Sequence, residues 1–188
     1  MKNKIQAPKA KKILKTIAAH NDARHDYYYW LNDATNPEVI DYLKKENIYC
    51  DHMMSHTNSF QATLFNEMKS RIKEDDESVP YKFNGYWYIV KYEVGKDYPI
   101  YIRRKESLSA LDEILFDCND MASGHAYFRL SGISVSPDNT KVAYGIDTIG
   151  RRQYTIYVKD LKTSKLLSKD IINTTGSSTW ANDNKTIY

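Results

Sequence analysis

The longest regular pattern in the chain is a stripe of mostly apolar residues that recurs at steps of three, four and seven between residues 36 and 74. Such spacing places side chains on one face of an α-helix. Asn36 is a suitable N-cap, Pro37 suits the first turn, and Glu38 suits the positive end of the helix dipole. The pattern predicts one long helix, or two helices with a break near Asp51. The stripe consists of Val39, Ile40, Leu43, Cys50, Met53, Met54, Thr57, Phe60, Leu64, Met68 and Ile72.

The helical pattern ends in an acidic run that is followed by a proline. Residues 74–77 are all acidic, and acidic side chains at a helix C-terminus oppose the helix dipole. Val79 precedes Pro80, which disfavours the helical conformation of Val79. We therefore expect two domains. Residues 1–78 hold a basic arm and a helical docking segment, and residues 79–188 hold β-structure.

Beyond Pro80 the pattern changes to short apolar strands separated by turn residues. Tyr81–Phe83 and Tyr86–Val90 flank Asn84-Gly85, a dipeptide that is typical of two-residue hairpin turns. Short strands with frequent turn residues predict an antiparallel sheet. Further strands are expected at Tyr98–Ile102, Gly132–Val135, Lys141–Tyr144 and Gln153–Val158, and a further turn at Asp160–Thr163.

A strand–turn–strand unit recurs in the second half of the chain. Ser136–Tyr144 is echoed by Ala181–Tyr188, and Asp138 and Asp183 occupy equivalent positions 45 residues apart. Aspartate and asparagine suit such turns because their side chains bond to their own backbone and tolerate left-handed conformations. A repeat of this length is typical of four-stranded β-propeller blades. We therefore predict a mainly β fold with an N-terminal α-helical segment and a partial β-propeller.

The predicted propeller is incomplete. Residues 79–188 provide about two to three blades at roughly 40–45 residues each, whereas a ring needs at least about four. Tyr188 ends an apolar strand that no turn follows. We therefore expect a truncated chain that is a fragment of a longer protein. Its exposed strand edges and helix face are expected to favour self-association.

The positive charge of the chain is concentrated at its start. The formal net charge is +3, but six of the 27 basic residues precede residue 16, and the rest of the chain is slightly acidic. These six residues are Lys2, Lys4, Lys9, Lys11, Lys12 and Lys15. We interpret them as a solvated arm, and we expect no nucleic-acid partner.

The sequence also favours one cellular compartment. No apolar stretch approaches the roughly 18 residues that a membrane-spanning helix needs, and the N-terminus lacks the apolar core of a signal peptide. Cys50 and Cys118 lie far apart and form no CxxC motif, which favours reduced thiols. We expect a cytoplasmic protein without a membrane partner.

The candidate catalytic and metal-binding residues give weak signals. His52 and His56 are spaced to share a helix face, but a zinc site needs a third ligand, and the glutamate of an H-E-x-x-H motif is absent. Ser134 and Ser178 lie in strings that lack the second glycine of G-x-S-x-G. We therefore predict no catalytic, cofactor-binding or metal-binding residue in this chain, and no cofactor.

Two basic clusters and one aromatic cluster remain. Arg103-Arg104-Lys105 and Arg151-Arg152 are interpreted as solvated or salt-bridged positions beside strands, rather than as sites for an acidic ligand. Tyr27–Trp30 is interpreted as an anchor that holds an irregular segment against a larger domain, because aromatic side chains bury much area. A ligand-stacking surface is the alternative interpretation of this aromatic cluster.

Short motifs follow one another in a distinctive order along the chain. They are Pro8-Lys9-Ala10, Asp26, Tyr28-Tyr29-Trp30-Leu31, Tyr42-Leu43, Glu46-Asn47, Asn84-Gly85-Tyr86, Tyr98-Pro99-Ile100-Tyr101, Arg151-Arg152-Gln153-Tyr154 and Trp180-Ala181-Asn182-Asp183. This order resembles the start of the prolyl oligopeptidase family of serine peptidases (S9), and within it the oligopeptidase B branch. The resemblance runs from about Pro8 to Tyr188.

The resemblance implies a two-domain serine peptidase. In this family a C-terminal α/β-hydrolase domain carries the catalytic Ser, Asp and His residues. A seven-bladed propeller covers the active site, so only oligopeptides are cut, in the oligopeptidase B branch after Arg or Lys. The N-terminal segment packs on the hydrolase domain. None of the catalytic positions falls in this chain, so the chain alone is expected to be inactive. A non-catalytic propeller scaffold that binds a protein partner is the alternative.

Overall fold

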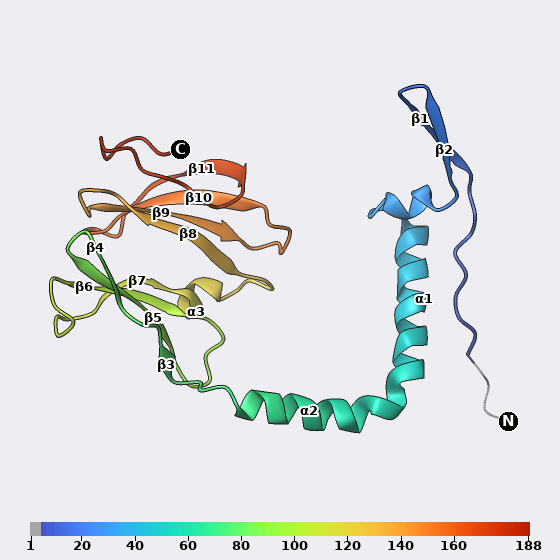
Figure 1. The fold of residues 1–188 in the computed structure, drawn as a ribbon, viewed down its shortest axis with the longest axis horizontal. Helices are drawn as coiled ribbons and strands as arrows, with labels where there is room; N and C mark the ends of the chain where they lie inside the picture. Colours follow the sequence, from blue (N-terminus) through green and yellow to red (C-terminus); the bar gives the residue numbers. More distant parts are fainter. Residues whose placement is uncertain (1–4) are drawn as a thin grey trace. The chain divides into compact units, whose positions relative to one another are not determined.

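The computed structural model describes residues 5–188, which fold as two separate units (Figure 1). The first unit ends at Ile72 and the second begins at Lys73. The predicted boundary after residue 78 lies later than this division, because β3 (Asp76–Glu77) already pairs with a strand of the second unit. Lys2 and Lys4 of the predicted basic arm lie outside the described residues.

The first unit consists of a hairpin followed by helices. Its elements are β1 (Lys15–Ala19), β2 (Asp22–Asp26), the 3₁₀ turn η1 (Tyr29–Asn32), α1 (Pro37–Met54), the 3₁₀ turn η2 (Ser55–Thr57) and α2 (Asn58–Ser70). This hairpin was not predicted from the sequence. His20 and Asn21 form its turn with φ angles of 51° and 63°, as a type I′ turn requires. Its strand residues are mostly exposed, so no apolar alternation announces them in the sequence.

The start of α1 confirms the predicted N-cap. The Asn36 side chain accepts a hydrogen bond from the Glu38 amide at 2.9 Å, which satisfies an amide that has no partner within the helix. Pro37 occupies the first turn, where its missing N–H removes no helical bond.

The helical region is interrupted close to the predicted position. The break follows Met54, a few residues beyond Asp51. The hydroxyls of Ser55 and Thr57 donate to backbone carbonyls three residues earlier, at 2.8 Å and 2.7 Å, and such bonds compete with regular helical ones. α2 ends at Ser70, so the last turn of the predicted helix does not form.

The second unit consists of two antiparallel sheets and a single bridge that follows them (Figure 1). The first sheet contains β3, β4 (Tyr81–Phe83), β5 (Tyr86–Tyr92), β6 (Ile100–Lys105) and β7 (Glu113–Asp117). The second contains β8 (Arg129–Val135), β9 (Lys141–Asp147), β10 (Tyr154–Asp160) and β11 (Leu166–Thr174), and α3 (Cys118–Ala122) lies between the sheets in sequence. Within residues 5–188 the sheets do not close into a ring, and they confirm a partial propeller.

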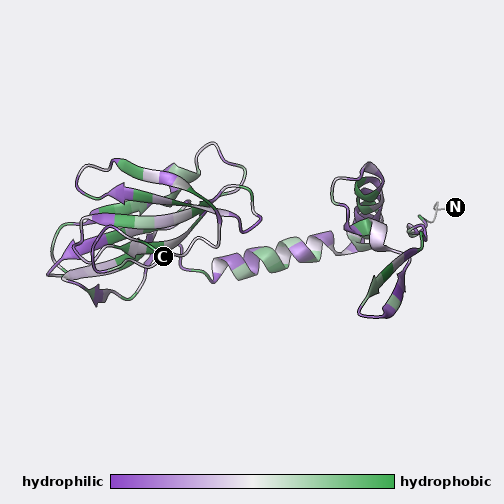
Figure 2. Ribbon diagram, turned by 90° about the horizontal axis from the view of Figure 1, so that it is seen from above, coloured by the Kyte–Doolittle hydropathy of each residue, from purple (hydrophilic) through white to green (hydrophobic). Residues whose placement is uncertain are grey.

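The main hydrophobic core of the second unit involves both sheets. Its buried members are Tyr88, Leu115, Phe116, Cys118, Phe128, Val142 and Tyr144. The rings of Phe116 from β7 and Tyr144 from β9 lie 4.5 Å apart between centroids. Figure 2 shows hydrophobic stretches within strands of the second unit, whereas α2 alternates between hydrophobic and hydrophilic bands along its length. Because its members come from both sheets, this core joins them. Burial of each large apolar side chain contributes about 1.5–3 kcal/mol to the stability of the fold.

The predicted repeat is confirmed by three equivalent turns. Asn84, Asn139 and Asn184 adopt positive φ angles of 47°, 61° and 58°. The Asn139 side-chain amide donates to the Asn84 carbonyl at 3.1 Å, and the Asp138 amide donates to the Asn184 side-chain oxygen at 2.9 Å. Each turn therefore bonds to its counterpart in the next repeat. We refer to this chain of contacts, centred on Asn84, Asn139 and Asn184, as the turn ladder.

Candidate functional site

The two histidines singled out in the sequence lie at the helical break. His52 belongs to α1 and His56 to η2, and both are exposed. The His56 Nδ1 atom lies 3.0 Å from the Met53 carbonyl oxygen. The described part of the chain contains no group of three or more His, Cys, Asp or Glu side chains that could hold a metal ion. The structure therefore brings no third ligand to this pair.

The two serines singled out in the sequence lie in β8 and in the segment after β11. Ser134 belongs to β8, as predicted, and its carbonyl accepts a hydrogen bond from the Trp180 indole at 2.8 Å. The Ser178 hydroxyl oxygen is buried and has no hydrogen-bond partner within residues 5–188. Neither hydroxyl is bonded to a histidine among these residues, so the structure assembles no nucleophile and base.

The first basic cluster is salt-bridged, as the sequence indicates. Arg103 is only 3% exposed, and its guanidinium donates to both carboxylate oxygens of Glu113, at 2.7 Å and 2.9 Å. Burial opposes the charge of Arg103, but the bonds to Glu113 outweigh it and raise the pKa of the guanidinium. Arg104 donates to Asp112 at 2.6 Å. Arg103 and Arg104 are thus engaged in ion pairs with residues 112 and 113 at the start of β7.

The second basic cluster lies in an exposed loop that a buried carboxylate organises. Asp147 is 1% exposed and accepts hydrogen bonds from the amides of Ile149, Gly150 and Arg152 at 2.8, 3.0 and 2.8 Å. Burial alone would raise the pKa of Asp147, but these amides hold it below the usual value. Arg151 and Arg152 are exposed at the surface of this loop.

The aromatic cluster at residues 27–30 combines one anchor with three exposed rings. The Trp30 indole donates to the Lys11 carbonyl at 3.0 Å, and its ring meets that of Tyr42 in α1 edge-on at 6.4 Å. Lys11 also forms an ion pair with Glu38. Trp30 thereby fastens the N-terminal segment to α1. The other three rings, Tyr27, Tyr28 and Tyr29, are each more than 40% exposed.

Both long helices present large apolar side chains to solvent. The exposed ones in α1 and α2 are Ile40, Leu43, Ile48, Met53, Met54, Phe60, Leu64, Phe65 and Met68. Across residues 5–188, no helix combines the length and hydropathy that crossing a bilayer requires. Exposed apolar area of this extent is typical of a surface that another protein domain covers.

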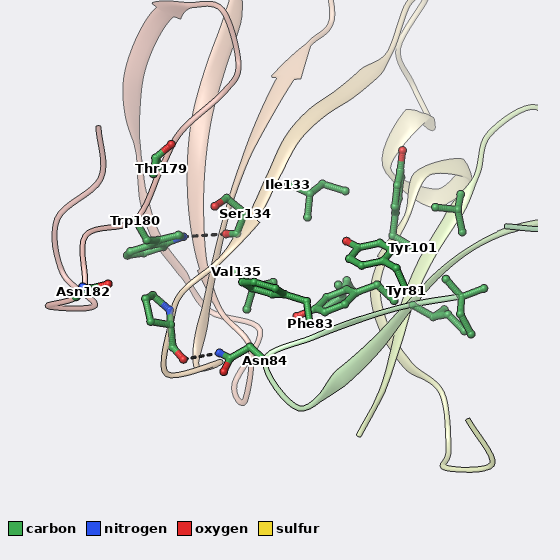
Figure 3. Close-up of a pocket in the computed structure, with 16 residues that line it drawn as sticks. Tyr81, Phe83, Asn84, Tyr101, Ile133, Ser134, Val135, Thr179, Trp180 and Asn182 are labelled. Atoms are coloured by element: carbon green, nitrogen blue, oxygen red, sulfur yellow. Dashed lines mark hydrogen bonds between the residues drawn. The ribbon is translucent and has the colours of Figure 1, made fainter. Parts of the chain in front are cut away.

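A groove with a volume of about 860 Å³ lies in the second unit (Figure 3). We call it the aromatic groove. Its walls come from both sheets and from the segment around Trp180. The lining consists of Tyr81, Phe83, Asn84, Tyr88, Ile89, Val90, Tyr101, Ile102, Leu115, Ile133, Ser134, Val135, Pro137, Thr179, Trp180 and Asn182. The side chains of this lining are aromatic, aliphatic or neutral polar.

Alternation along β4 explains part of the groove's aromatic character. Tyr81 and Phe83 line the groove and are 61% and 59% exposed, whereas Lys82 between them lies over the Trp87 ring at 5.7 Å. Tyr81 stacks on Tyr88 with 5.2 Å between ring centroids. Burial raises the pKa of both tyrosines, so their hydroxyls remain neutral at physiological pH.

Polar groups at the edge of the groove are largely occupied. The Asn84 side-chain amide donates to the Pro137 carbonyl at 2.6 Å, and the Trp180 indole donates to Ser134 (Figure 3). The exception is the Tyr88 hydroxyl, which is buried close to Arg103 without hydrogen-bond geometry to any described residue. The groove was not predicted, because its walls are far apart in the sequence. Tyr81 and Phe83, exposed on one strand face, are its only local signal.

Comparison with known proteins places this architecture in a family. A family model described as "Prolyl oligopeptidase, N-terminal beta-propeller domain" matches residues 8–188. Dipeptidyl aminopeptidase BI of Pseudoxanthomonas mexicana is 38% identical, with 95% of this chain and 27% of the relative covered. Protease 2 of Moraxella lacunata is 33% identical, with 90% and 25% covered.

Solved structures agree with these matches. The structure of oligopeptidase B from Leishmania major superposes with a TM-score of 0.82 at 26% identity, with 93% of this chain and 27% of that chain covered. Oligopeptidase B from Trypanosoma brucei gives a TM-score of 0.81 at 23% identity, with the same coverage, and supports the fold. The chain spans about a quarter of the length of the curated relatives it matches. The chain therefore belongs to the prolyl oligopeptidase (S9) family of peptidases and contains part of that family's N-terminal β-propeller domain.

Proposed function

We propose that this chain is the N-terminal part of a serine peptidase that hydrolyses short peptides after Arg or Lys. In this proposal the active site belongs to a C-terminal α/β-hydrolase domain, and the propeller limits access to it. The observation that carries the proposal is the family match over residues 8–188, together with the likeness to oligopeptidase B. The aromatic groove fits this division of roles, because it offers a binding surface without catalytic groups.

The first unit is proposed to dock on the hydrolase domain. Its exposed rings at residues 27–29 and the apolar side chains of α1 and α2 supply the area that such an interface needs. Trp30 keeps the N-terminal segment against α1 through the Lys11 carbonyl, so the docking surface is already shaped before the partner domain arrives.

The central test compares this chain with the longer product of the same gene. We expect the longer protein to release a fluorophore from benzoyl-Arg-aminomethylcoumarin, and the purified 188-residue chain to release none. Activity of the short chain that survives further purification would contradict the proposed location of the active site. A longer protein that is inactive on this substrate and unreactive towards fluorophosphonates would instead favour a non-catalytic scaffold.

A second candidate activity follows from the relative named dipeptidyl aminopeptidase BI, which is 38% identical to this chain. Such an activity would release dipeptides from a free N-terminus. The benzoyl-blocked substrate distinguishes the two, because an aminopeptidase needs the free amine. Cleavage of Gly-Arg-aminomethylcoumarin without cleavage of the blocked compound would select the aminopeptidase over the endopeptidase.

We also propose a cytoplasmic location, on the basis of the two free cysteines, Cys50 and Cys118. Fractionation of the native host with an antibody against this chain tests the location. Recovery in the soluble cytoplasmic fraction is expected, and recovery in the culture medium or periplasm would refute it.

A further inference from the structure

The aromatic groove has a feature that its apolar lining alone does not explain. β4 forms one wall, and its only strand partner among the described residues is β5. Within residues 5–188 its other edge therefore has no neighbouring strand. Backbone N–H and C=O groups at an unpaired edge are ready to pair with another extended segment. The groove thus combines an open strand edge with a row of side-chain contacts.

The side chains beside this edge are arranged with the period of a strand. Tyr81 and Phe83 line the groove from β4, whereas Lys82 between them does not. From β8 the consecutive residues 133–135 line the opposite side of the groove (Figure 3). An extended peptide also presents every second side chain on one face. The β4 wall of the groove therefore matches the spacing of alternate residues in such a peptide.

The chemistry of the lining selects the side chains that fit. No charged residue lines the groove, so a charged side chain would lose its hydration without gaining an ion pair. Tyr81 and Phe83 are more than half exposed, and a large apolar or aromatic side chain would cover them at a gain proportional to the area buried. The stacked pair of Tyr81 and Tyr88 offers a flat surface for such a ring.

We infer that the aromatic groove binds an extended oligopeptide that carries large apolar or aromatic side chains at alternate positions, with its backbone added to the open edge of β4. Strand addition of this kind gives affinity through backbone hydrogen bonds and specificity through alternate side chains. The inference rests on the proposed function, since the occupant is a segment of the peptide substrate. It adds a preference for apolar residues away from the cleaved bond, at a surface that lacks catalytic groups.

The test uses the 188-residue chain and three blocked pentapeptides. The first, acetyl-Gly-Phe-Gly-Phe-Gly-amide, places both rings on one face of an extended peptide. The second, acetyl-Gly-Phe-Phe-Gly-Gly-amide, has the same composition but places them on opposite faces. The third contains serine in place of phenylalanine. Binding is followed by amide chemical shifts in ¹⁵N-labelled protein, with residues 81–84, residues 133–135 and the Trp180 indole as reporters.

We expect the first peptide to bind and to shift these reporters. It should bind at least about tenfold more tightly than the other two, because burial of an aromatic ring raises the binding affinity by about one to two orders of magnitude. Phe83→Ser should weaken binding of the first peptide to a similar extent. Phe65→Ser is the matched control, since Phe65 is 65% exposed in α2, outside the groove, and binding should not change.

Three results would overturn the inference. The first is equal binding of the three peptides or no shift of the reporters by the first peptide at millimolar concentration. The second is equal loss of binding in the Phe83→Ser and Phe65→Ser variants. The third is movement of the same reporters with rising protein concentration alone, which would make a second copy of the chain the occupant. Hydrolysis by the longer protein is measured separately, so the peptidase proposal can fail or survive independently of the groove.

Discussion

Asparagine residues at left-handed turn positions set the contacts between neighbouring repeats. Asn139 combines a φ angle of 61° with a side-chain hydrogen bond to the Asn84 carbonyl. Its own carbonyl lies 3.4 Å from the nearest Arg103 guanidinium nitrogen. Asparagine suits the position because its short polar side chain tolerates the left-handed region better than most residues do. Asn139 therefore determines the conformation of its own turn and also contacts the first sheet.

Substitution of Asn139 should separate these two contributions. Asn139→Gly keeps access to positive φ and loses the side-chain bond, whereas Asn139→Ala loses both. We expect the alanine variant to have a free energy of unfolding about 1–2 kcal/mol below that of the glycine variant, because alanine is strained at positive φ. Urea denaturation followed by circular dichroism measures the difference. Equal stability of the two variants would show that the backbone conformation does not matter there.

The two cysteines differ in burial, and this predicts their reactivity and one pH effect. Cys118 is 1% exposed and Cys50 is exposed. Burial raises the pKa of the Cys118 thiol from 9.0 to about 12, so the folded state holds this proton more tightly than the unfolded state. The contribution of this thiol to the free energy of unfolding is fully present below about pH 9 and is lost as pH rises towards 12.

Iodoacetamide at pH 8 is therefore expected to modify Cys50 alone in the native chain, because only the thiolate reacts. Mass spectrometry of tryptic peptides identifies the modified residue. Cys50→Ser should abolish labelling under native conditions, and denaturation should restore labelling at Cys118. Rapid native labelling of Cys118 would contradict the buried position of this thiol.

At the scale of secondary-structure elements, glycines allow the connection after β11 to cross the second sheet closely. A Cβ atom built on Gly132 in β8 would lie 1.8 Å from the Gly176 carbonyl oxygen. A Cβ on Gly145 in β9 would lie 2.6 Å from the Gly176 Cα. The backbone of residue 176 therefore approaches both strands more closely than any side chain would allow.

Gly132→Ala should be much more harmful than Gly124→Ala. Both glycines have positive φ, but nothing lies within 4 Å of a Cβ at Gly124. The two variants share a backbone cost of about 1–2 kcal/mol, and Gly132→Ala adds overpacking of about 1–3 kcal/mol or more. Thermal unfolding of the two variants provides the comparison. A similar loss of stability in both would mean that the connection shifts freely.

The sequence predicted those elements whose signals are local. The Asn84-Gly85 hairpin and the Asn36 cap depend on residues close together in the chain, and both are confirmed. β11 was missed because register shifts in its pairing with β10 remove a regular apolar alternation. β7 was missed because its apolar residues are consecutive, between Glu113 and Asp117, and so show no alternation. The β1–β2 hairpin was missed because it buries little and so needs no apolar pattern.

At the scale of the whole molecule, the candidate site was the least predictable feature. The aromatic groove joins β4, β8 and the Trp180 segment, which lie up to about 100 residues apart. Sequence patterns report burial along one element, whereas a groove depends on how several elements meet. The prediction that no catalytic residue lies in this chain stays a prediction, since only the longer protein can reveal where the active site is.

Exposed apolar surface on the helices predicts association of the isolated chain. Phe60 and Phe65 are each 65% exposed in α2, within a larger apolar area. We expect sedimentation velocity to show reversible association as protein concentration rises, because burial of this apolar surface between copies of the chain is favourable. Phe60→Asp combined with Phe65→Asp should shift the population towards monomer. A single monomeric species at all concentrations would refute this expectation.

The turn ladder has a consequence for how such a protein is made. Each turn bonds to the turn of the adjoining repeat, as Asn139 does to Asn84 and Asp138 to Asn184. Arrays with nearest-neighbour contacts have stabilities that add repeat by repeat. A completed sheet can therefore serve as the template for the next one while the ribosome is still adding residues. We expect assembly to proceed in the direction of synthesis and to begin before a ring closes.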